Sequence, residues 1–446
     1  MDFLKEAEAL KEETIRIRRY FHENPDVTGL EEPTTLWIKD YLDSLGIETD
    51  FVKDGGLFAY IYGKGYENSK PSDEVPTVML RADVDALPVQ ESENNLSGKK
   101  VCISKKPGVC HACGHDAHIA MTLAAAKILN DHKDELKGRV VLMFERGEEG
   151  PNNVVFLMRH IIETGLHIDT VYGTHIVSFL EKGKISLRKG PVMAGGVFFK
   201  VKLIGRGGHG SRPDAAANPI DCYVSIANKL NEFRMKHVDP FHAFTYAPTV
   251  VQSGSADNVI PGELLFGANV RLYEPEDGIN FKKYFLEVLE HECSVYGCRY
   301  EIEYLVGPKM PVKCDAECVD IAVKTIGEAV GKERITSVEP WMACESICGC
   351  LAIWPGVFSF LGSMDMENGY GALHHSPEFD IIEDVMPLGA AAAAAYAYGF
   401  LENPAKSKKG WFDGSIADFY EASGYNDGVL ALLREGKPYE ISPDKR

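Results

Sequence analysis

No stretch of this 446-residue sequence is long and apolar enough to cross a lipid bilayer, which takes roughly 18 or more uncharged residues. The nearest candidate, residues 390–401, is shorter and so rich in alanine that it indicates a packed helix. Residues 1–21 carry charges throughout and lack the apolar segment of a signal peptide. We therefore expect a cytoplasmic protein that does not bind membranes.

Positive charge is scarce relative to negative charge. The sequence has 47 Lys and Arg residues against 66 Asp and Glu residues, which gives a formal net charge of −19. The phosphate backbone of a nucleic acid would be repelled by such a surface. Nucleic acids are therefore not expected as partners, although the charge inside a cleft is not constrained by this balance.

A disulfide framework is not expected either. The 11 cysteines are an odd number, and no signal peptide precedes them. Most of these thiols should be free and buried in the core, as is usual in a reducing compartment.

The first part of the sequence alternates between helical and strand patterns. Predicted helices cover residues 3–22, 34–45, 116–129 and 154–164, and predicted strands cover residues 77–83, 139–144 and 170–175. Asp116 is placed to cap the third of these helices. Strands that alternate with helices form a mostly parallel sheet covered on both faces, and the ligand site of such a sheet lies beyond the carboxyl ends of its strands.

An inserted region interrupts this pattern. In it a strand, a helix, two strands, a helix and a last strand follow one another, which is the β-α-β-β-α-β order of ferredoxin-like domains. We predict an α/β domain formed by residues 1–191 and 308–402, with an inserted α+β domain at residues 192–307. Residues 403–446 are rich in Lys, Asp and Gly and form a C-terminal extension of unknown role.

Four clusters carry residues that can bind metals or transfer protons. They are Cys113-Gly114-His115, Glu148-Glu149, His175 and His374-His375. Taken alone, each has an ordinary structural explanation, because a single histidine is often a core residue and a Glu-Glu pair is often solvated. Three of the clusters, however, lie at predicted carboxyl ends of strands, where side chains converge. Thiolate, imidazole and carboxylate groups gathered there suit a pair of divalent cations.

Two other interpretations of the cysteines remain open. Cys110 and Cys113 could join Cys348 and Cys350 in a structural zinc site with four thiolates, although the second pair lacks the usual C-x-x-C spacing. Cys110-x-x-Cys113 could also be a thioredoxin-like redox pair. The predicted helix begins about three residues beyond the second cysteine, which does not favour the redox role.

The motifs and their order resemble the M20 metallopeptidase superfamily, in particular the amidohydrolase branch of bacterial aminoacylases, hippurate hydrolases and plant auxin-conjugate hydrolases. The matching segments are residues 80–88 (LRADVDALP), 111–118 (HACGHDAH), 148–150 (EEG), 205–211 (GRGGHGS), 258–261 (NVIP) and 375–377 (HSP). The resemblance implies an α-β-α catalytic domain with a zinc-peptidase-like sheet, interrupted by a ferredoxin-like lid. It also implies that this lid is the dimerisation domain of a homodimer.

The resemblance further implies a role for each matching residue. The metal ligands would be Cys113, His115, Glu149, His175 and His375, holding two divalent ions per subunit, zinc or manganese, with cobalt also admitted. Glu148 would be the general base, and Asp83 would be the carboxylate that orients the ligands. His209 would stabilise the oxyanion in the partner's site. Asn258 and Arg271 would be lid residues that hold the polar end of the substrate.

These roles suit the hydrolysis of an amide. Divalent cations activate water and polarise a carbonyl group. Glu148 can take the proton of the water and pass it to the leaving amine. Arg271 offers a planar fork for a carboxylate, which would favour amino acid derivatives over plain amides. The expected substrate is therefore a small N-acyl or aromatic-acyl amino acid.

The sequence departs from the family pattern near the expected site. Glu145 and Arg146 stand just before the glutamate pair, where close relatives carry Pro-Ala, and would add charge beside the metals or the substrate. Residues 342–346 (MACES) keep only Glu345 of the usual Ser-Glu-Asp-Phe, and Cys344 could line the pocket. These differences leave the identity of the substrate open.

Two alternatives to an amidohydrolase follow. One is a dipeptidase or carboxypeptidase of the same superfamily, although those enzymes generally carry His-x-Asp where this sequence has Arg81-Ala82-Asp83. The other is a catalytically silent binding dimer. That alternative predicts the loss of Glu148 or of a metal ligand, and the sequence keeps them all.

Overall fold

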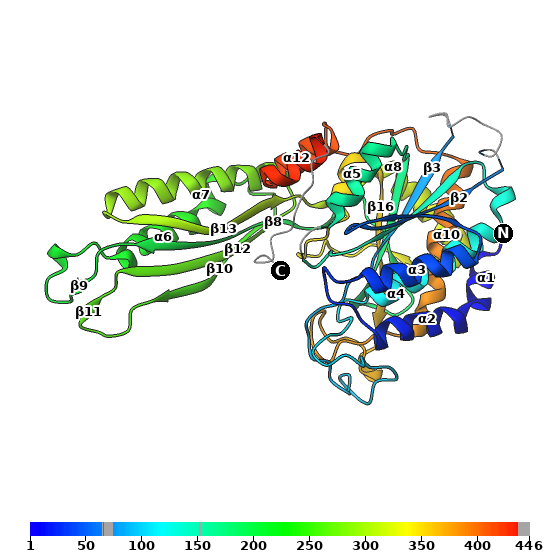
Figure 1. The fold of residues 1–446 in the computed structure, drawn as a ribbon, viewed down its shortest axis with the longest axis horizontal. Coiled ribbons are helices and arrows are strands. Elements are labelled where there is room, and N and C mark those ends of the chain that lie inside the picture. The colour runs from blue at the N-terminus through cyan, green and yellow to red at the C-terminus, as the bar shows by residue number, and fades with distance from the viewer. Residues whose placement is uncertain (65, 67–74, 151–152, 436–446) are drawn as a thin grey trace.

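The computed structural model describes residues 1–64, 66, 75–150 and 153–435. Figure 1 shows a wide α/β body and an elongated arm that extends from it. Each has its own hydrophobic core, and the core of the arm is formed by residues between Val197 and Cys298. In the described part of the chain, the helices are too short or too polar to cross a membrane.

The α/β body is built on one mixed sheet of eight strands. Their order is β1 (Glu48–Val52), β2 (Gly56–Tyr62), β4 (Arg139–Glu145), β3 (Thr77–Asp83), β5 (Thr170–Glu181), β16 (Gly356–Met364), β6 (Ile185–Ser186) and β15 (Ile335–Thr336). The four central strands, β4, β3, β5 and β16, run parallel to one another. The predicted parallel sheet is therefore present, with antiparallel pairs added on both sides of it, β2 beside β4 and β6 beside β16.

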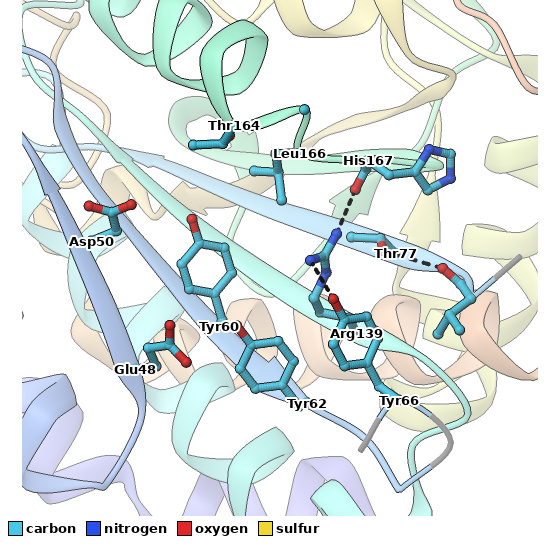
Figure 2. Close-up of a pocket in the computed structure, with 12 residues that line it drawn as sticks. Glu48, Asp50, Tyr60, Tyr62, Tyr66, Thr77, Arg139, Thr164, Leu166 and His167 are labelled. Carbon is cyan, nitrogen blue, oxygen red and sulfur yellow. Dashed lines mark hydrogen bonds between the residues drawn. The ribbon is translucent and has the colours of Figure 1, made fainter. Parts of the chain in front are cut away.

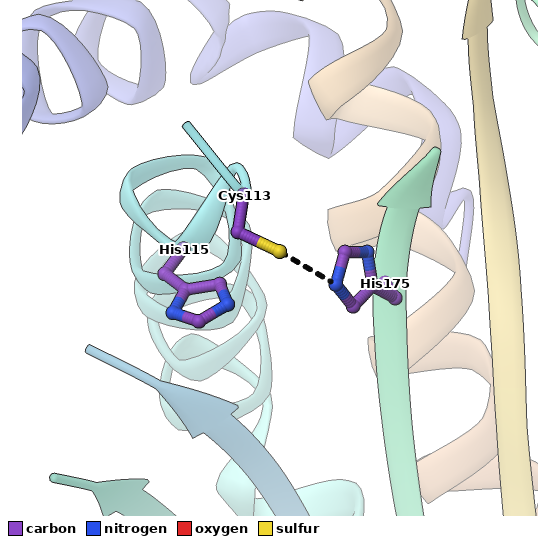
Figure 3. A group of neighbouring side chains, drawn as sticks. All are labelled: Cys113, His115 and His175. Atoms are coloured by element: carbon purple, nitrogen blue, oxygen red, sulfur yellow. Dashed lines mark hydrogen bonds between the residues drawn. The ribbon is translucent and has the colours of Figure 1, made fainter. Parts of the chain in front are cut away.

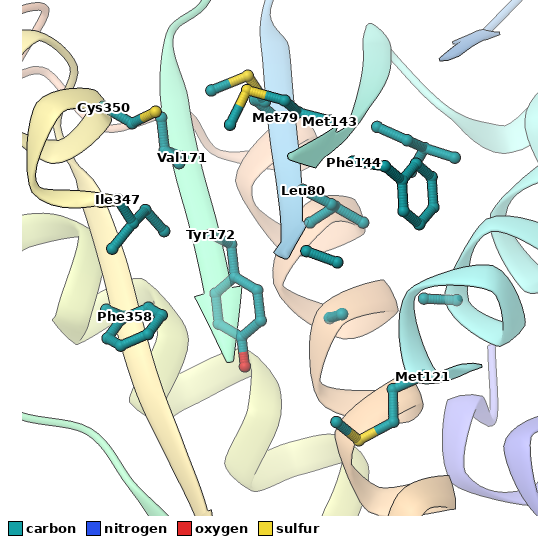
Figure 4. Packing of buried hydrophobic residues seen from close by; sticks show 14 of the residues in the cluster. Met79, Leu80, Met121, Met143, Phe144, Val171, Tyr172, Ile347, Cys350 and Phe358 are labelled. Atoms are coloured by element: carbon teal, nitrogen blue, oxygen red, sulfur yellow. The ribbon is translucent and has the colours of Figure 1, made fainter. Parts of the chain in front are cut away.

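Helices cover the sheet, as the apolar strands predict. The helices of the body are α1 (Phe3–Ala9), α2 (Lys11–Glu23), α3 (Glu32–Ser44), α4 (His115–Asp131), α5 (Val154–Thr164), α8 (Ala316–Val330), α9 (Cys348–Ile353) and α10 (Met386–Glu402). All residues of β3 are buried, so successive side chains such as Met79 and Leu80 are covered on opposite faces (Figure 4). On the face of Leu80, α4 and α10 approach so closely that a Cβ on Gly389 would stand 2.2 Å from the sulfur of Met121.

The arm is the predicted ferredoxin-like domain, and it forms the lid. Its order is β8 (Gly195–Ile204), α6 (Pro219–His237), β10 (Phe244–Ser253), β12 (Glu263–Leu272), α7 (Pro275–Val295) and β13 (Arg299–Lys309). The strands form an antiparallel sheet in the order β10-β12-β8-β13. Two short strands, β9 (Gly208–His209) and β11 (Val259–Ile260), pair at the end farthest from the body (Figure 1). The pair β7 (Gly190–Met193) and β14 (Val312–Cys314) joins the lid to the body.

The predicted cap at Asp116 is wrong. Helix α4 begins at His115, and the residue before it, Gly114, has a φ of +88°. A side chain on Gly114 would stand 2.5 Å from the Cγ2 of Ile176, so glycine is required at this turn. Asp116 is fully buried and forms an ion pair with the Nε of Arg18 at 2.8 Å. A cap at Asp116 would require the helix to begin at residue 117, and α4 starts two residues earlier, so the carboxylate lies within the helix and is used in the core.

The C-terminal extension contains two helices, α11 (Ile416–Ala422) and α12 (Asp427–Glu435). Phe419, Tyr420 and Leu432 belong to the hydrophobic core of the body. Residues 436–446 of the predicted extension lie outside the described residues. Figure 1 shows α12 at the junction between the body and the lid.

Candidate active site

Of three neighbouring central strands, β3 and β4 end level with each other and β5 continues past them, which leaves a gap beside β5. β3 ends at Asp83 and β4 ends at Glu145, but β5 continues to Glu181. The last pairing of β3 with β5 joins Arg81 to Gly173. His175 was predicted to end its strand, which is wrong. It lies within β5, two residues beyond the last residue that pairs with β3, so its side chain can face the gap.

Cys113, His115 and His175 gather at this gap (Figure 3). The Sγ of Cys113 lies 3.5 Å from the Nε2 of His175. One ligand atom from each of the three residues lies within 4.8 Å of those of the other two, and all three side chains are buried. The loop before α4, the first residue of α4 and the middle of β5 therefore supply a thiol and two imidazoles to one point.

A second group shares Cys113 and adds Glu149 and His375. The Nε2 of His375 lies 2.8 Å from the Oε1 of Glu149. The backbone of His375 has a φ of +66°, which is uncommon for a residue with a side chain, and its N–H donates to the carbonyl of Ala112 at 2.8 Å. That hydrogen bond holds the strained turn against the loop that carries Cys113.

The free ring nitrogens indicate which histidines can bind metal. The Nδ1 of His115 faces the Oδ1 of Asp85 at 3.1 Å, whereas its Nε2 is buried without a hydrogen-bond partner among the described residues. The Nδ1 of His175 donates to the carbonyl of Ile176 at 2.7 Å, which leaves Nε2 as the acceptor beside Cys113. In both rings Nδ1 faces an oxygen atom, which leaves Nε2 as the nitrogen that can bind a cation.

His118 has no such free nitrogen. Its Nδ1 bonds the Oδ1 of Asp83 at 2.6 Å, and its Nε2 accepts the N–H of Ile176 at 2.9 Å. Although it lies close to His115 and Asp83, it fixes Asp83 instead of offering a ligand atom. Asp83 also accepts from the Nη1 of Arg81 at 2.6 Å. Asp83 is therefore fixed by His118 and Arg81, and its role in orienting the metal ligands stays a prediction.

The concentration of carboxylates around Cys113 and His115 favours the binding of cations. Burial and the carboxylates of Glu149 and Glu148 hold the pKa of the Cys113 thiol well above its usual range. Burial opposes a charge on His115, but the nearby carboxylates of Asp83 and Asp85 outweigh it and raise its pKa to about 10. Divalent cations would replace these protons and stabilise the thiolate. The residues present therefore fit a metal centre.

Glu148 lies beside this centre, close to His115 and Glu149. Burial and the carboxylates of Glu345 and Glu149 raise its pKa well above its usual range. The backbone N–H of Ser346 donates to its Oε1 at 3.1 Å. One oxygen is thus fixed by the backbone of a loop that lies far away in the sequence.

Glu145 and Arg146 both have charged or polar partners within the body, and whether they also affect the metals or the substrate stays a prediction. Glu145 accepts from the Nε of Arg81 at 2.8 Å and from the Oγ of Ser346 at 2.6 Å. Arg146 pairs with Glu31 at 3.2 Å. Both charged side chains are therefore paired and buried away from solvent.

The lid residues with predicted roles fall into two places. His209 and Asn258 are exposed neighbours at the end of the lid, where the N–H of Gly210 donates to the carbonyl of Asn258 at 2.8 Å. In a single chain they lie far from the metal group (Figure 1). Arg271 lies at the opposite end of β12 and donates to the Sγ of Cys344 at 2.6 Å. Its guanidinium stacks over the ring of Phe198 at 4.8 Å.

Sequence reasoning assigned no individual role to two residues that contact candidate ligands. Asp85 was given no role, yet it bonds His115 and also accepts the backbone N–H of Glu149 at 2.9 Å. His374 lies with its Nδ1 3.8 Å from the Sγ of Cys113, and its Nε2 accepts the N–H of Ser178 at 3.3 Å. The sequence offered a signal for each residue. Asp85 ends an Asp-x-Asp motif, and His374 begins the His-His-Ser-Pro motif.

The rival interpretations of the cysteines find no support in the geometry. Among the described residues, the candidate metal groups that contain Cys113 combine it with histidines or Glu149, and none contains a second cysteine. All 11 cysteines are free, and most are buried, as predicted.

A large hollow lies elsewhere, at the starts of β3 and β4 (Figure 2). It has a volume of about 380 Å³ and is lined by Tyr60, Tyr62 and Arg139, among others. The Nη2 of Arg139 donates to the carbonyl of His167 at 3.0 Å. Because the metal group lies near the carboxyl ends of these strands, the hollow belongs to the other end of the sheet.

The fold and the donor set define a two-domain, metal-dependent hydrolase. Residues 79–398 match Peptidase family M20/M25/M40, and the chain belongs to this family. Three relatives are similar over much of its length. The chain is 32% identical to IAA-amino acid hydrolase ILR1-like 4 of Arabidopsis thaliana over 87% of this chain and 85% of that protein. It is 34% identical to thermostable carboxypeptidase 2 of Saccharolobus solfataricus over 86% and 95% of the two chains, and 31% identical to the N-acyl-L-amino acid amidohydrolase of Geobacillus stearothermophilus over 69% and 79%.

A solved structure gives the same fold. The YXEP protein of Bacillus subtilis, described as a dinuclear metal binding peptidase from the M20 family, superposes with a TM-score of 0.70 and 26% identity over 89% of this chain and 99% of that one. The protein is thus an M20 metal-dependent amidohydrolase or peptidase, with a catalytic and a lid domain.

Proposed function

We propose that this hydrolase cleaves the amide bond of a small N-acyl or aromatic-acyl amino acid, with two divalent metal ions in each subunit. The observation that carries the proposal is the pair of donor groups that share Cys113, one completed by His115 and His175 and the other by Glu149 and His375. Thiolate and imidazole suit zinc, and the mixed donor set also admits manganese or cobalt.

The ions would supply an activated water and a polarised carbonyl group. Glu148 would take the proton of the nucleophile and return it to the leaving amine, a role worth roughly 10²–10⁴-fold in rate. Its position beside Glu149 and His115 supports this, since the base and the ligands then come from adjacent residues. Nearby cations would also favour the carboxylate form of Glu148.

Arg271 would bind the carboxylate of the substrate. Its guanidinium is half-buried at the end of the lid that meets the catalytic domain, next to Cys344. A planar fork of donors matches a carboxylate better than a neutral amide. This contact would favour N-acyl amino acids over simple amides.

We further infer a homodimer through the lid. In the described sheet, β10 has a neighbour on one side only, and most of its residues, including Val251, are exposed. An exposed edge strand pairs readily with a second copy. His209 and Asn258 would then reach the site of the partner, where a donor to the oxyanion is worth roughly 2.7–4 kcal/mol.

We also infer a cytoplasmic location. The 11 free cysteines support it, because thiols stay reduced in that compartment.

The test is an assay of metal-reconstituted protein against a matched set of substrates. The chain is stripped with a chelator and reloaded with zinc, manganese or cobalt. N-acetyl and N-benzoyl amino acids are compared with the same acyl groups on amines that lack a carboxylate. We expect hydrolysis of the first set only. Glu148→Gln should keep the metals and lose activity, whereas Cys113→Ser should lose the metals, and retained hydrolysis in Glu148→Gln would refute the base.

A carboxypeptidase is the second candidate, because the relative from Saccharolobus solfataricus carries that name at 34% identity. Peptides of several residues distinguish the two functions. A carboxypeptidase releases the last residue of an unblocked peptide, whereas the proposed aminoacylase acts only on the single acylated amino acid.

A further inference from the structure

The C-terminal segment, residues 403–435, is attached to α9 by its backbone. The N–H of Gly410 donates to the carbonyl of Ile353 at 2.9 Å, and the N–H of Phe412 donates to that of Ala352 at 3.0 Å. A Cβ on Gly410 would stand 2.2 Å from the carbonyl oxygen of Ala352. The segment therefore lies directly on the last turn of α9.

Helix α11 then packs on the first turn of α9. Tyr420 and Phe419 are buried, and Gly349 faces them. A Cβ on Gly349 would lie 3.1 Å from the hydroxyl of Tyr420 and 3.4 Å from the ring of Phe419. The two aromatic side chains fill the space in front of this turn.

The first turn of α9 follows the loop that contacts the general base. Ser346 lies two residues before Cys348, where α9 begins, and its N–H donates to Glu148. Its hydroxyl donates to Glu145 at 2.6 Å and accepts from the Nη2 of Arg81 at 2.8 Å. A shift of α9 would therefore move the donor that holds Glu148.

A small cavity separates the segment from this loop. It has a volume of about 20 Å³ and is lined by Glu345 and Ser346 on one side and by Tyr420 and Ser423 on the other. Among the described residues, the hydroxyls of Tyr420 and Ser423 are buried without hydrogen-bond partners. A cavity of this size has room for one water, which can bridge such groups.

The segment also reaches the end of β13, the last strand of the lid. Gly424 has a φ of +74°, and a Cβ there would stand 2.2 Å from the carbonyl oxygen of Gly307. The Nζ of Lys282, in α7 of the lid, donates to the same carbonyl at 2.8 Å. Helix α12 contacts α5, which follows the glutamate pair. The segment is thus supported on several sides and can hold α9 firmly.

We propose that residues 403–435 position the general base, with Tyr420 as the positioning residue that holds α9 and, through Ser346, the carboxylate of Glu148. This role rests on the proposed function, in which Glu148 is the base. Among the described residues, Tyr420 belongs to none of the candidate metal groups. Its loss should therefore lower kcat without altering metal content or KM.

The experiment compares three variants of the full chain. Tyr420→Ala removes the ring, Tyr420→Phe keeps it, and Phe400→Ala removes a fully buried ring of α10 as a control for lost stability. Since a misplacement of about 1 Å can cost about 100-fold in rate, we expect kcat to fall by about 10- to 100-fold in Tyr420→Ala. KM should stay within about twofold, Tyr420→Phe should recover most of the rate, and Phe400→Ala should keep kcat per folded molecule.

Hydrogen exchange gives a second readout that needs no substrate. The amides of residues 346–353 should exchange faster in Tyr420→Ala than in the wild type or in Phe400→Ala. An unchanged kcat together with unchanged exchange would overturn the proposal, as would an equal loss of kcat in Phe400→Ala. If the wild type cleaves no N-acyl amino acid, the proposed function fails, and the exchange result still decides whether the segment holds α9.

Discussion

Asp85 connects the two donor groups of the candidate metal centre, because it contacts His115 of one group and Glu149 of the other. Its Oδ1 lies 3.1 Å from the Nδ1 of His115, and its Oδ2 accepts the backbone N–H of Glu149. One carboxylate therefore orients the ring of a candidate ligand from α4 and the backbone of a candidate ligand that follows β4. Partners of this kind are typically worth 10- to 100-fold in metal affinity.

Asp85→Ala should weaken metal binding by about 10- to 100-fold, because His115 loses the partner that keeps its Nε2 lone pair free. Titration of metal-free protein with zinc or manganese measures this. Asp277→Ala is a matched control, since Asp277 bonds His242 at 2.8 Å in the lid and is also buried. Equal affinity in Asp85→Ala and the wild type would contradict the assigned role.

Stability should fall in acid because of Glu91. Its partners are the Nε2 of His22 at 2.9 Å, the Nζ of Lys100 at 2.9 Å and the N–H of Ser104 at 2.7 Å. Burial would raise the pKa of Glu91, but these partners outweigh it and lower the pKa from 4.5 to about 2. Between these values the unfolded chain binds the proton more readily than the folded one, so stability present above pH 4.5 is lost as the pH falls through 2.

Glu91→Gln should therefore be less stable than the wild type at neutral pH and lose less on acidification. The unfolding midpoint of the catalytic domain, measured at neutral pH and at several values below 4.5, checks this. Glu23→Gln serves as control, because Glu23 pairs with Lys105 at 2.6 Å on the surface, where such pairs contribute little. If the unfolding midpoints of Glu91→Gln and of the wild type fall equally with pH, Glu91 does not cause the loss of stability in acid.

The sequence allowed the metal ligands to be proposed because each lies in a short motif at a fixed place in the chain order. The ferredoxin-like lid was predictable for a similar reason, since its strands alternate and its helices lie between them. Both features depend on local patterns. Local patterns can be recognised in a sequence without knowing which segments contact each other in the fold.

The remaining features depend on contacts between distant segments. The pairing of Asp116 with Arg18 joins α4 to α2, and nothing near Asp116 distinguishes it from a helix cap. The place of His175 within β5 depends on where β3 ends. The contact of Ser346 with Glu148 spans 198 positions. Such relationships follow from packing, which the pattern of one segment does not contain.

Gly424→Ala should destabilise the chain more than Gly46→Ala. Both residues have a left-handed backbone, with φ of +74° and +72°, so each substitution carries a conformational cost of roughly 1–2 kcal/mol. A Cβ at Gly46 meets no atom within 4 Å, whereas one at Gly424 meets the backbone of Gly307. Thermal unfolding and limited proteolysis of residues 403–435 measure the difference, and equal midpoints would show that the C-terminal segment yields freely where it meets Gly307.

Complementation between subunits tests whether His209 acts across the dimer. Chains carrying Glu148→Gln lack the base, and chains carrying His209→Ala lack the oxyanion donor, so each homodimer should be nearly inactive. In a mixed dimer, the His209→Ala chain keeps Glu148 and receives His209 from its partner. One of its two sites is then complete.

Equal amounts of the two variants, unfolded and refolded together, should form mixed dimers in half of the molecules. Activity should therefore recover to about a quarter of the wild-type value, because the symmetry of the dimer gives each mixed molecule one intact site. In the control, the double variant Glu148→Gln/His209→Ala is added to wild-type chains. Activity should then fall in proportion to the wild-type sites that no longer receive His209 from their partner. If His209 served its own chain instead, mixing the single variants would restore no activity. The exposure of His209 and Asn258 at the end of the lid would then need another explanation.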